Sequence, residues 1–319
     1  MCAGLLCCFP DLHPQSRAAA HKGAKFVVMS PDRSPEDASH DAALMPGVSI
    51  VIPAYNEASV IRQCLIAAIY QSVPAAEIIV VDNMSKDRTA DIVRQMQQEY
   101  PESPIILLSQ DRDQGLIPTR NFGLNHATGD VLGRIDADSV VEPDWVEQVQ
   151  KAFLDPAVQA ATGPVVYYDM PMRRFGLKAD DKMRQLMLKL AKHQYHFLFG
   201  SNMALRRSAW ETIRDETCRD EKDEMHEDID LSLHLADHDL RVQYWPQMVS
   251  GMSARRLEDS PRDYRYYVTR FDRTYKAHNV KKMALKAPMV VFFSVYFPAK
   301  LLRAIHTVNS AQPVRRGGQ

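Results

Sequence analysis

The chain has 319 residues, 45% of them apolar and 25% charged, which is the composition of an ordinary globular protein. This excludes a largely disordered, collagen-like or coiled-coil chain, and the length allows one or two domains of about 150 residues. Lys and Arg number 39 against 40 Asp and Glu, so the net charge is −1 and nucleic-acid binding is not expected. The five cysteines form no CxxC pair, which favours a reducing, cytoplasmic location.

The composition changes along the chain and divides it into three parts. Residues 1–45 carry scattered Pro, Ser and Asp without hydrophobic periodicity, and we expect a disordered tail. Residues 46–258 are predicted to form one α/β domain, and residues 259–319 a C-terminal helical extension. No uninterrupted run of 18 apolar residues occurs, so a full membrane span is not expected.

Short apolar runs alternate with segments of helical spacing from Val48 onward. The runs cover 48–52, 77–82, 104–108 and 130–136, and the helical segments cover 58–70, 87–100, 118–126, 177–193 and a stretch from Glu227. This alternation predicts βαβ units, hence a mostly parallel, Rossmann-like sheet with helices on both faces. Ligands of such sheets bind beyond the carboxyl ends of the strands.

Polar or acidic residues follow every predicted strand. Asp136 and Asp138 come directly after an apolar run, and two carboxylates with this spacing can face one divalent cation, Mn²⁺ or Mg²⁺. The alternative is a solvated loop that leads into the next helix. A GxGxxG or GxxxxGK[ST] motif is missing from the sequence, which disfavours a nicotinamide enzyme or a P-loop NTPase.

Five motifs occur in a fixed order: PAYNE at 53–57, VVDNMSKDRT at 80–89, QGLIPTRNFGLNHATGD at 114–130, IDADS at 135–139 and HEDIDLSLHL at 226–235. Together they resemble the landmarks of family 2 glycosyltransferases with the GT-A fold, over about residues 47–250. The resemblance implies an inverting transfer of a sugar from a nucleoside-diphosphate sugar to a hydroxyl acceptor. UDP is the commonest nucleotide of such donors.

The resemblance also implies roles for individual residues. Asp228 matches the family's catalytic base, Glu227 beside it is the second expected catalytic residue, and Asp138, with Asp136, would bind the metal. The nucleotide sugar would be contacted by Pro53, Tyr55, Glu57, Asp82, Arg120, Asn121, Asp136 and Ala137. One departure concerns the third metal ligand, because Met252 stands where relatives often carry a histidine.

The chemistry of Asp228 supports the same role without the resemblance. Inverting transfer needs a carboxylate that deprotonates the acceptor on the face opposite the leaving diphosphate. The alternative is that Glu227 and Asp228 only favour the N-terminus of a helix. A second alternative is a metal hydrolase with His226, Asp230, His234 and His238 as ligands. His234 and His238 have the four-residue spacing of a helical zinc pair, although Leu235 stands where an HExxH motif needs Glu.

Two other functions stay open at this point: a catalytically silent GT-A-like binding module, and a GT-A-like nucleotidyltransferase. The latter needs a Gly-rich basic loop after the first strand, which PAYNE is not. Residues 287–302 hold about 13 uninterrupted apolar positions between basic flanks, which predicts a peripheral contact with the inner face of the cytoplasmic membrane. A lipid-linked acceptor would suit that location. The alternative is a helix that packs on the catalytic domain or forms a dimer contact.

Overall fold

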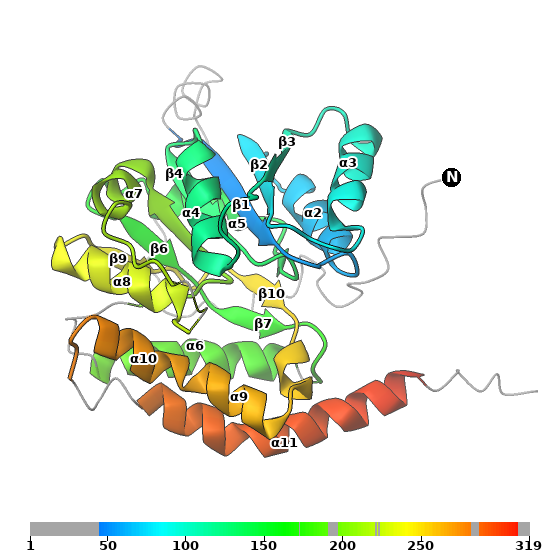
Figure 1. The fold of residues 1–319 in the computed structure, drawn as a ribbon, viewed down its shortest axis with the longest axis vertical. Coiled ribbons are helices and arrows are strands. Elements are labelled where there is room, and N and C mark those ends of the chain that lie inside the picture. The colour runs from blue at the N-terminus through cyan, green and yellow to red at the C-terminus, as the bar shows by residue number, and fades with distance from the viewer. Residues whose placement is uncertain are drawn as a thin grey trace, which may run out of the picture. The chain divides into compact units, whose positions relative to one another are not determined.

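The computed structural model describes residues 45–171, 173–190, 197–220, 222, 224–281 and 287–311; of the predicted tail, it describes only Met45. Its centre is a seven-stranded sheet with the strand order β3-β2-β1-β4-β8-β6-β9 (Figure 1). The strands are β1 (Val48–Ala54), β2 (Glu77–Asp82), β3 (Ile105–Ser109), β4 (Val131–Arg134), β6 (Ala160–Thr162), β8 (Met203–Arg206) and β9 (Val242–Tyr244).

The four predicted strands are β1 to β4, and they lie side by side. β1 pairs in parallel with β2 and β4, and β2 pairs in parallel with β3, whereas β8 runs antiparallel to β4 and β6. The order 3-2-1-4 is that of a Rossmann-like half-sheet. The predicted mostly parallel α/β architecture is therefore confirmed.

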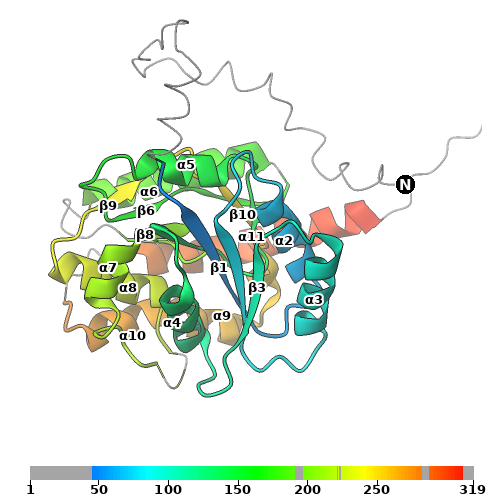
Figure 2. The ribbon, with the colours of Figure 1, turned by 90° about the horizontal axis from the view of Figure 1, so that it is seen from above.

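Both faces of the sheet are covered because the strands are apolar on both sides. Ile50 and Ile52 of β1 belong to one buried cluster, and Val51 belongs to the other, as the period of two along a strand requires. Figure 2 shows the two helical layers on opposite sides of the sheet. The first cluster includes α2 (Ile61–Ile69), α3 (Thr89–Glu99) and α5 (Trp145–Ala152); the second includes α4 (Leu116–His126), α7 (Arg207–Ile213) and α8 (Glu227–Asp237).

A small second sheet and the C-terminal helices lie beneath the main sheet in Figure 1. The small sheet has the order β5-β10-β7. The C-terminal helices confirm that the chain ends in a helical extension. These elements are β5 (Val140–Val141), β7 (Val165–Tyr167), α6 (Arg173–Leu190), β10 (Ser250–Met252), the 3-10 helix η3 (Arg255–Glu258), α9 (Pro261–Val268), α10 (Arg270–Ala277) and α11 (Ala287–Ala311).

Helix α11 is anchored on η3 by polar contacts. The Tyr296 hydroxyl and Lys300 Nζ each donate to the carbonyl oxygen of Asp259 at 2.7 Å, and Arg303 pairs with Asp169 at 2.9 Å. Lys300 and Arg303, which the sequence suggested as a flank for lipid headgroups, therefore bind the protein itself.

The window Met289–His306 of α11 is long and apolar enough to cross a membrane, and 6% of it is buried.

Gly123 permits a close approach of α4 to β1 and β2 of the main sheet. A Cβ added there would lie 2.4 Å from Cγ1 of Val51 and 2.9 Å from Cγ2 of Val81, both of which are buried strand side chains. We expect Gly123→Ala to destabilise the fold by about 1–3 kcal/mol, because the core cannot take an extra methyl group. Chemical denaturation followed by circular dichroism measures the loss.

Gly176 of α6 supplies the matched control, because a Cβ added there meets nothing within 4 Å. Alanine favours a helix over glycine, so Gly176→Ala should be neutral or slightly stabilising. Equal effects of the two substitutions would contradict the close packing of α4 on β1 and β2.

Candidate active site

The loops that follow β1 and β2 are locked together by hydrogen bonds. The backbone N–H of Asn56 donates to Oγ of Ser85 at 2.9 Å, and that of Glu57 donates to Oγ1 of Thr89 at 2.8 Å. Asn56 and Met84 both adopt left-handed backbone conformations, with φ of 55° and 59°. The motifs PAYNE and VVDNMSKDRT therefore form one unit, strained at two positions, at the carboxyl edge of the sheet.

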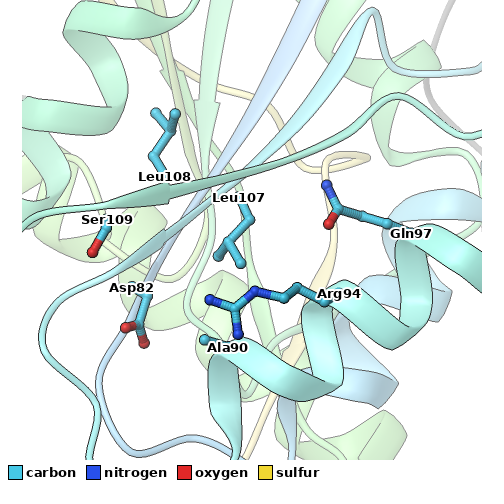
Figure 3. A pocket seen from close by; sticks show the side chains of 7 residues that line it. All are labelled: Asp82, Ala90, Arg94, Gln97, Leu107, Leu108 and Ser109. Carbon is cyan, nitrogen blue, oxygen red and sulfur yellow. The ribbon is translucent and has the colours of Figure 1, made fainter.

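Asp82 lies at the end of β2 and borders an open pocket of about 390 Å³. The side chain is largely buried, yet its Oδ1 has no hydrogen-bond partner among the described residues. Figure 3 shows Asp82 and Ser109 at the ends of adjacent strands, across from Arg94 and Gln97 of α3. Tyr55 is 42% exposed, so its ring is accessible to a ligand.

Asn83 fixes the loop that leads into α4. Its Nδ2 donates to the carbonyl oxygens of Gln110 and Asp113, both at 2.9 Å, and its Oδ1 accepts from the backbone N–H of Gly115 at 2.8 Å. Gly115 has φ of 138°, a conformation that favours glycine. The side chain of Asn83 thus sets where α4, which carries Arg120 and Asn121, begins.

Two fully buried arginines hold the Glu227 carboxylate from both sides. Arg120 Nη1 lies 2.9 Å from Oε2 of Glu227, and Arg134 Nη1 lies 3.1 Å from Oε1. Arg134 also pairs with Asp136 at 2.8 Å, so it links the end of β4 to the start of α8. Asn121 Oδ1 accepts two hydrogen bonds from Arg120, at 2.9 Å and 2.7 Å.

Gly200 is required where this network is most crowded. A Cβ at position 200 would lie 2.3 Å from Oε1 of Glu227 and 2.5 Å from Nη1 of Arg134. The same residue donates its backbone N–H to Oδ2 of Asp228 at 3.0 Å. The Gly200-Ser201-Asn202 segment is thus part of the site's framework, and the buried Asn202 holds backbone oxygens of Pro164 and Met248 at 2.9 Å and 2.7 Å.

The surroundings of Asp228 suit a base that is ionised near neutral pH. Burial, reinforced by the negative charge of Glu227, raises the pKa of Asp228 to about 6. The N-cap of α8 is His226, without a side-chain cap, and the Glu227 carboxylate points to the arginines. Glu227 and Asp228 do lie in the first turn of α8, where acids favour the helix dipole, and the ion pairs of Glu227 are an additional interaction.

Asp138 and Glu57 share the guanidinium of Arg255. Arg255 donates to both oxygens of Glu57, at 2.8 Å and 2.6 Å, and its Nε lies 3.0 Å from Oδ2 of Asp138. Burial and the neighbouring Asp136 raise the pKa of Asp138 to about 6, while Arg255 opposes that rise. The carboxylates therefore gather more negative charge than one arginine offsets.

Asp136 and Asp138 are of the ligand type that a hard divalent cation prefers. Their carboxylate oxygens suit Mg²⁺ or Mn²⁺, and the Arg255 guanidinium against Asp138 and Glu57 marks a place for positive charge. Ala137 between the two aspartates is buried, and Pro53 lies in β1 opposite Val81. Met252 lies in β10, opposite Tyr167 of β7.

The structure brings most predicted residues to one edge of the sheet, and it adds two arginines. Arg134 was missed, although an arginine inside the apolar run DVLGRID is a signal, because a charge in a strand core needs a partner. The second is Arg255, one of several arginines between residues 255 and 270 for which the sequence leaves open a contact with the diphosphate or a solvated helix face. Its partners, Glu57 and Asp138, come from 198 and 117 positions earlier in the chain, so spacing could not reveal them.

The comparisons with known proteins identify the family of the chain. The model of "Glycosyl transferase family 2" matches residues 49–214, and that of "Glycosyl transferase family group 2" matches residues 134–309. The chain belongs to glycosyl transferase family 2. The family and the fold implied by the five motifs are both confirmed.

Named relatives and solved structures show how far the likeness extends. Glycosyltransferase AglE of Haloferax volcanii is 38% identical over 106 residues, which cover 33% of this chain and 34% of that protein. A chondroitin synthase of Pasteurella multocida is 33% identical over 110 residues, which cover 34% of this chain and 11% of that protein. The chain thus spans about a third or less of these relatives.

The fold is shared with a mannosyltransferase, PcManGT from Pyrobaculum calidifontis, in complex with GDP-Man and Mn²⁺. The two structures superpose with a TM-score of 0.56 at 22% identity, over 85% of this chain and 77% of that one. At this identity the likeness concerns the fold.

The ion pairs of Arg120 and Arg134 with Glu227 predict that a substitution of Glu227 strongly lowers the free energy of unfolding. Glu227→Gln removes the charge that compensates Arg120 and Arg134, so we expect a loss of about 3–5 kcal/mol in the free energy of unfolding. Urea denaturation followed by tryptophan fluorescence measures it. Glu99→Gln is the matched control: Glu99 pairs with Arg62 at the surface, and its loss should hardly move the midpoint. Equal shifts would contradict the central role of Glu227.

Proposed function

We propose that this protein is a metal-dependent, inverting glycosyltransferase that moves a sugar from a nucleoside-diphosphate sugar to a hydroxyl acceptor. One observation supports this best. Arg134 pairs with both Asp136 and Glu227, so it ties the Asp136–Asp138 pair to the neighbourhood of Asp228. Acids for the leaving group and an acid for the acceptor thus belong to one site but come from distant segments.

Asp228 is the proposed general base. Its Oδ2 accepts from Gly200 and its Oδ1 from the N–H of Ile229, so the carboxylate is oriented before a substrate arrives. It takes the proton of the acceptor hydroxyl while the acceptor oxygen attacks the anomeric carbon. The bond to the diphosphate breaks on the opposite face, and the nucleoside diphosphate leaves with the bonding electron pair.

Asp138 and Asp136 would hold the divalent cation, Mn²⁺ or Mg²⁺. Such a cation neutralises charge on a departing diphosphate. Arg255 forms ion pairs with Asp138 and Glu57. We propose that its side chain moves from these carboxylates to the diphosphate when the donor binds. The fit of a guanidinium to phosphate oxygens favours this exchange.

The nucleoside is proposed to contact Tyr55 and Asp82, with Glu57 near the ribose. The free Oδ1 of Asp82, among the described residues, is available to accept from a base N–H. UDP stays the predicted nucleotide, and GDP is the main competitor because the related mannosyltransferase fold was solved with GDP-Man. A catalytically silent nucleotide-sugar binder is the second candidate, and the intact Asp136, Asp138 and Asp228 weigh against it.

Two substitutions separate the proposed roles. Asp138→Ala should abolish the cation-dependent part of nucleoside-diphosphate binding, measured by calorimetry with UDP and GDP in the presence of Mn²⁺. Asp228→Asn should keep that binding but slow sugar transfer by about 10²–10⁴-fold, the usual worth of a general base. Transfer by Asp228→Asn at the rate of the unchanged protein would show that another group is the base.

Helix α11 supports a peripheral contact with a lipid bilayer. One side of the helix packs on the protein through Tyr296, while the other side exposes apolar side chains to solvent. These exposed residues are Val290, Phe293, Val295, Phe297, Leu301, Leu302 and Ile305. We propose that this face lies in the interface of the cytoplasmic membrane, where a lipid-linked acceptor would be within reach.

Flotation with anionic liposomes tests the membrane contact. The full chain should float with the vesicles, and the double variant Phe293→Glu/Phe297→Glu should stay in the soluble fraction, because two charges oppose insertion of the exposed face. Tyr70→Glu, at a tyrosine 63% exposed beside α2, is the control and should float. Flotation of the double variant, or dimerisation of the full chain without flotation, would contradict the proposal.

A further inference from the structure

Four metal-ligating side chains converge on one point outside the proposed active site. Cys218 follows α7, Asp230 and His234 lie one turn apart in α8, and His278 is the C-cap of α10. One ligand atom from each lies within 4.8 Å of the others. The Sγ of Cys218 is 3.6 Å from Nε2 of His278, which is 2.9 Å from Oδ1 of Asp230.

Two separations in the cluster match those around a single tetrahedral ion, whereas the 2.9 Å between Nε2 of His278 and Oδ1 of Asp230 is a hydrogen-bond distance that would lengthen when an ion binds. Metal–nitrogen distances of about 2.0–2.1 Å and a metal–sulfur distance of about 2.3 Å imply ligand separations of about 3.3 Å for N to O and about 3.6 Å for S to N. The Cys218–His278 separation equals the second value. His234 Nε2 lies 3.4 Å from Oδ1 of Asp230, close to the first.

A second, independent observation points to a missing ligand for this cluster. Asp230 is completely buried, and its Oδ2 accepts no hydrogen bond from any part of the chain that the structure describes. An uncompensated carboxylate oxygen in the interior is costly. Behind the cluster, Oε2 of Glu216 lies 3.9 Å from Nδ1 of His234, which places a carboxylate where metal-bound histidines commonly find one.

We propose that Cys218, Asp230, His234 and His278 bind one Zn²⁺ ion as a structural site. A thiolate and two imidazoles select zinc over Mg²⁺ or Mn²⁺, so this site differs in kind from the carboxylate site at Asp138. Binding releases the thiol proton of Cys218 to solvent and leaves its sulfur as a thiolate ligand. Four protein ligands leave no open position for water, so the ion would not hydrolyse a substrate.

The site would join three segments near the proposed base. The ion would tie the chain after α7 and the end of α10 to α8, whose first turn carries Asp228. The pairing of His234 with His238 that the sequence suggested does not form this site. His238 Nε2 instead lies 2.9 Å from Oε2 of Glu216.

Metal content and affinity test the proposal directly. The full chain, stripped by a chelator and titrated with Zn²⁺ alone against a competing metal indicator, should bind one ion tightly at this site. Cys218→Ser and His278→Asn should each weaken that binding by at least about 10²-fold, because loss of a direct ligand exceeds loss of an outer partner. His238→Asn is the matched control, and Asp138→Asn removes the carboxylate site; both should keep the tight zinc ion.

Cobalt spectroscopy gives a readout on the unchanged protein, which needs no variant to fold. The unchanged protein loaded with Co²⁺ should show a thiolate-to-metal charge-transfer band and the strong visible absorption of a tetrahedral ion. Cys218→Ser should lose the charge-transfer band, and Asp138→Asn should keep it. Absence of the band in the unchanged protein, or zinc affinity that is the same with and without Cys218, would overturn the site.

Discussion

The ion pairs of Glu227 with Arg120 and Arg134 are the interaction on which the rest of the site depends. Both arginines are buried, so each requires a charged partner at short range. The same contacts place the start of α8 beside the end of β4, which brings Asp228 and Asp136 to one edge of the sheet. Gly200 is a consequence of this crowding, since any side chain there would collide with Glu227 or Arg134. The positions of Asp136 and Asp228 thus depend on ion pairs made by neighbouring side chains.

The C-terminal helices extend this arrangement beyond the sheet. Helix α11 holds η3 through Tyr296 and Lys300, and η3 carries Arg255, which bridges Glu57 and Asp138. Helix α11, whose exposed face is proposed to contact lipid, is therefore linked through η3 to Asp138, which is proposed to bind the cation. On the other side, α10 supplies His278 to the cluster around Asp230, next to the helix turn that carries Asp228. The helices outside the Rossmann-like half thus contact the proposed site at two places, Asp138 and the first turn of α8.

The sequence predicts the parts of this protein that have a local signal. β1 to β4 were recognised because each is an apolar run, and the acidic residues were found because they follow those runs. β5, β6, β7 and β10 have two or three residues each, too few for a periodic pattern to emerge. Some contacts join residues that are far apart in the sequence, and only the folded structure shows them. Examples are Arg255 with Glu57 and Cys218 with His278. Likewise, the sequence located the apolar part of α11 but not which side faces the protein.

A donor screen tests the central claim most directly, because it needs no known acceptor. The full chain is incubated with UDP-, GDP-, ADP- and dTDP-sugars, with Mn²⁺, with Mg²⁺ or with a chelator, and free nucleoside diphosphate is measured. The account predicts that at least one donor is cleaved slowly to its nucleoside diphosphate when a cation is present, and that the chelator stops the release. Tight binding of a nucleotide sugar without any cation-dependent release, with or without a panel of hydroxyl acceptors, would contradict it and favour a silent binding module.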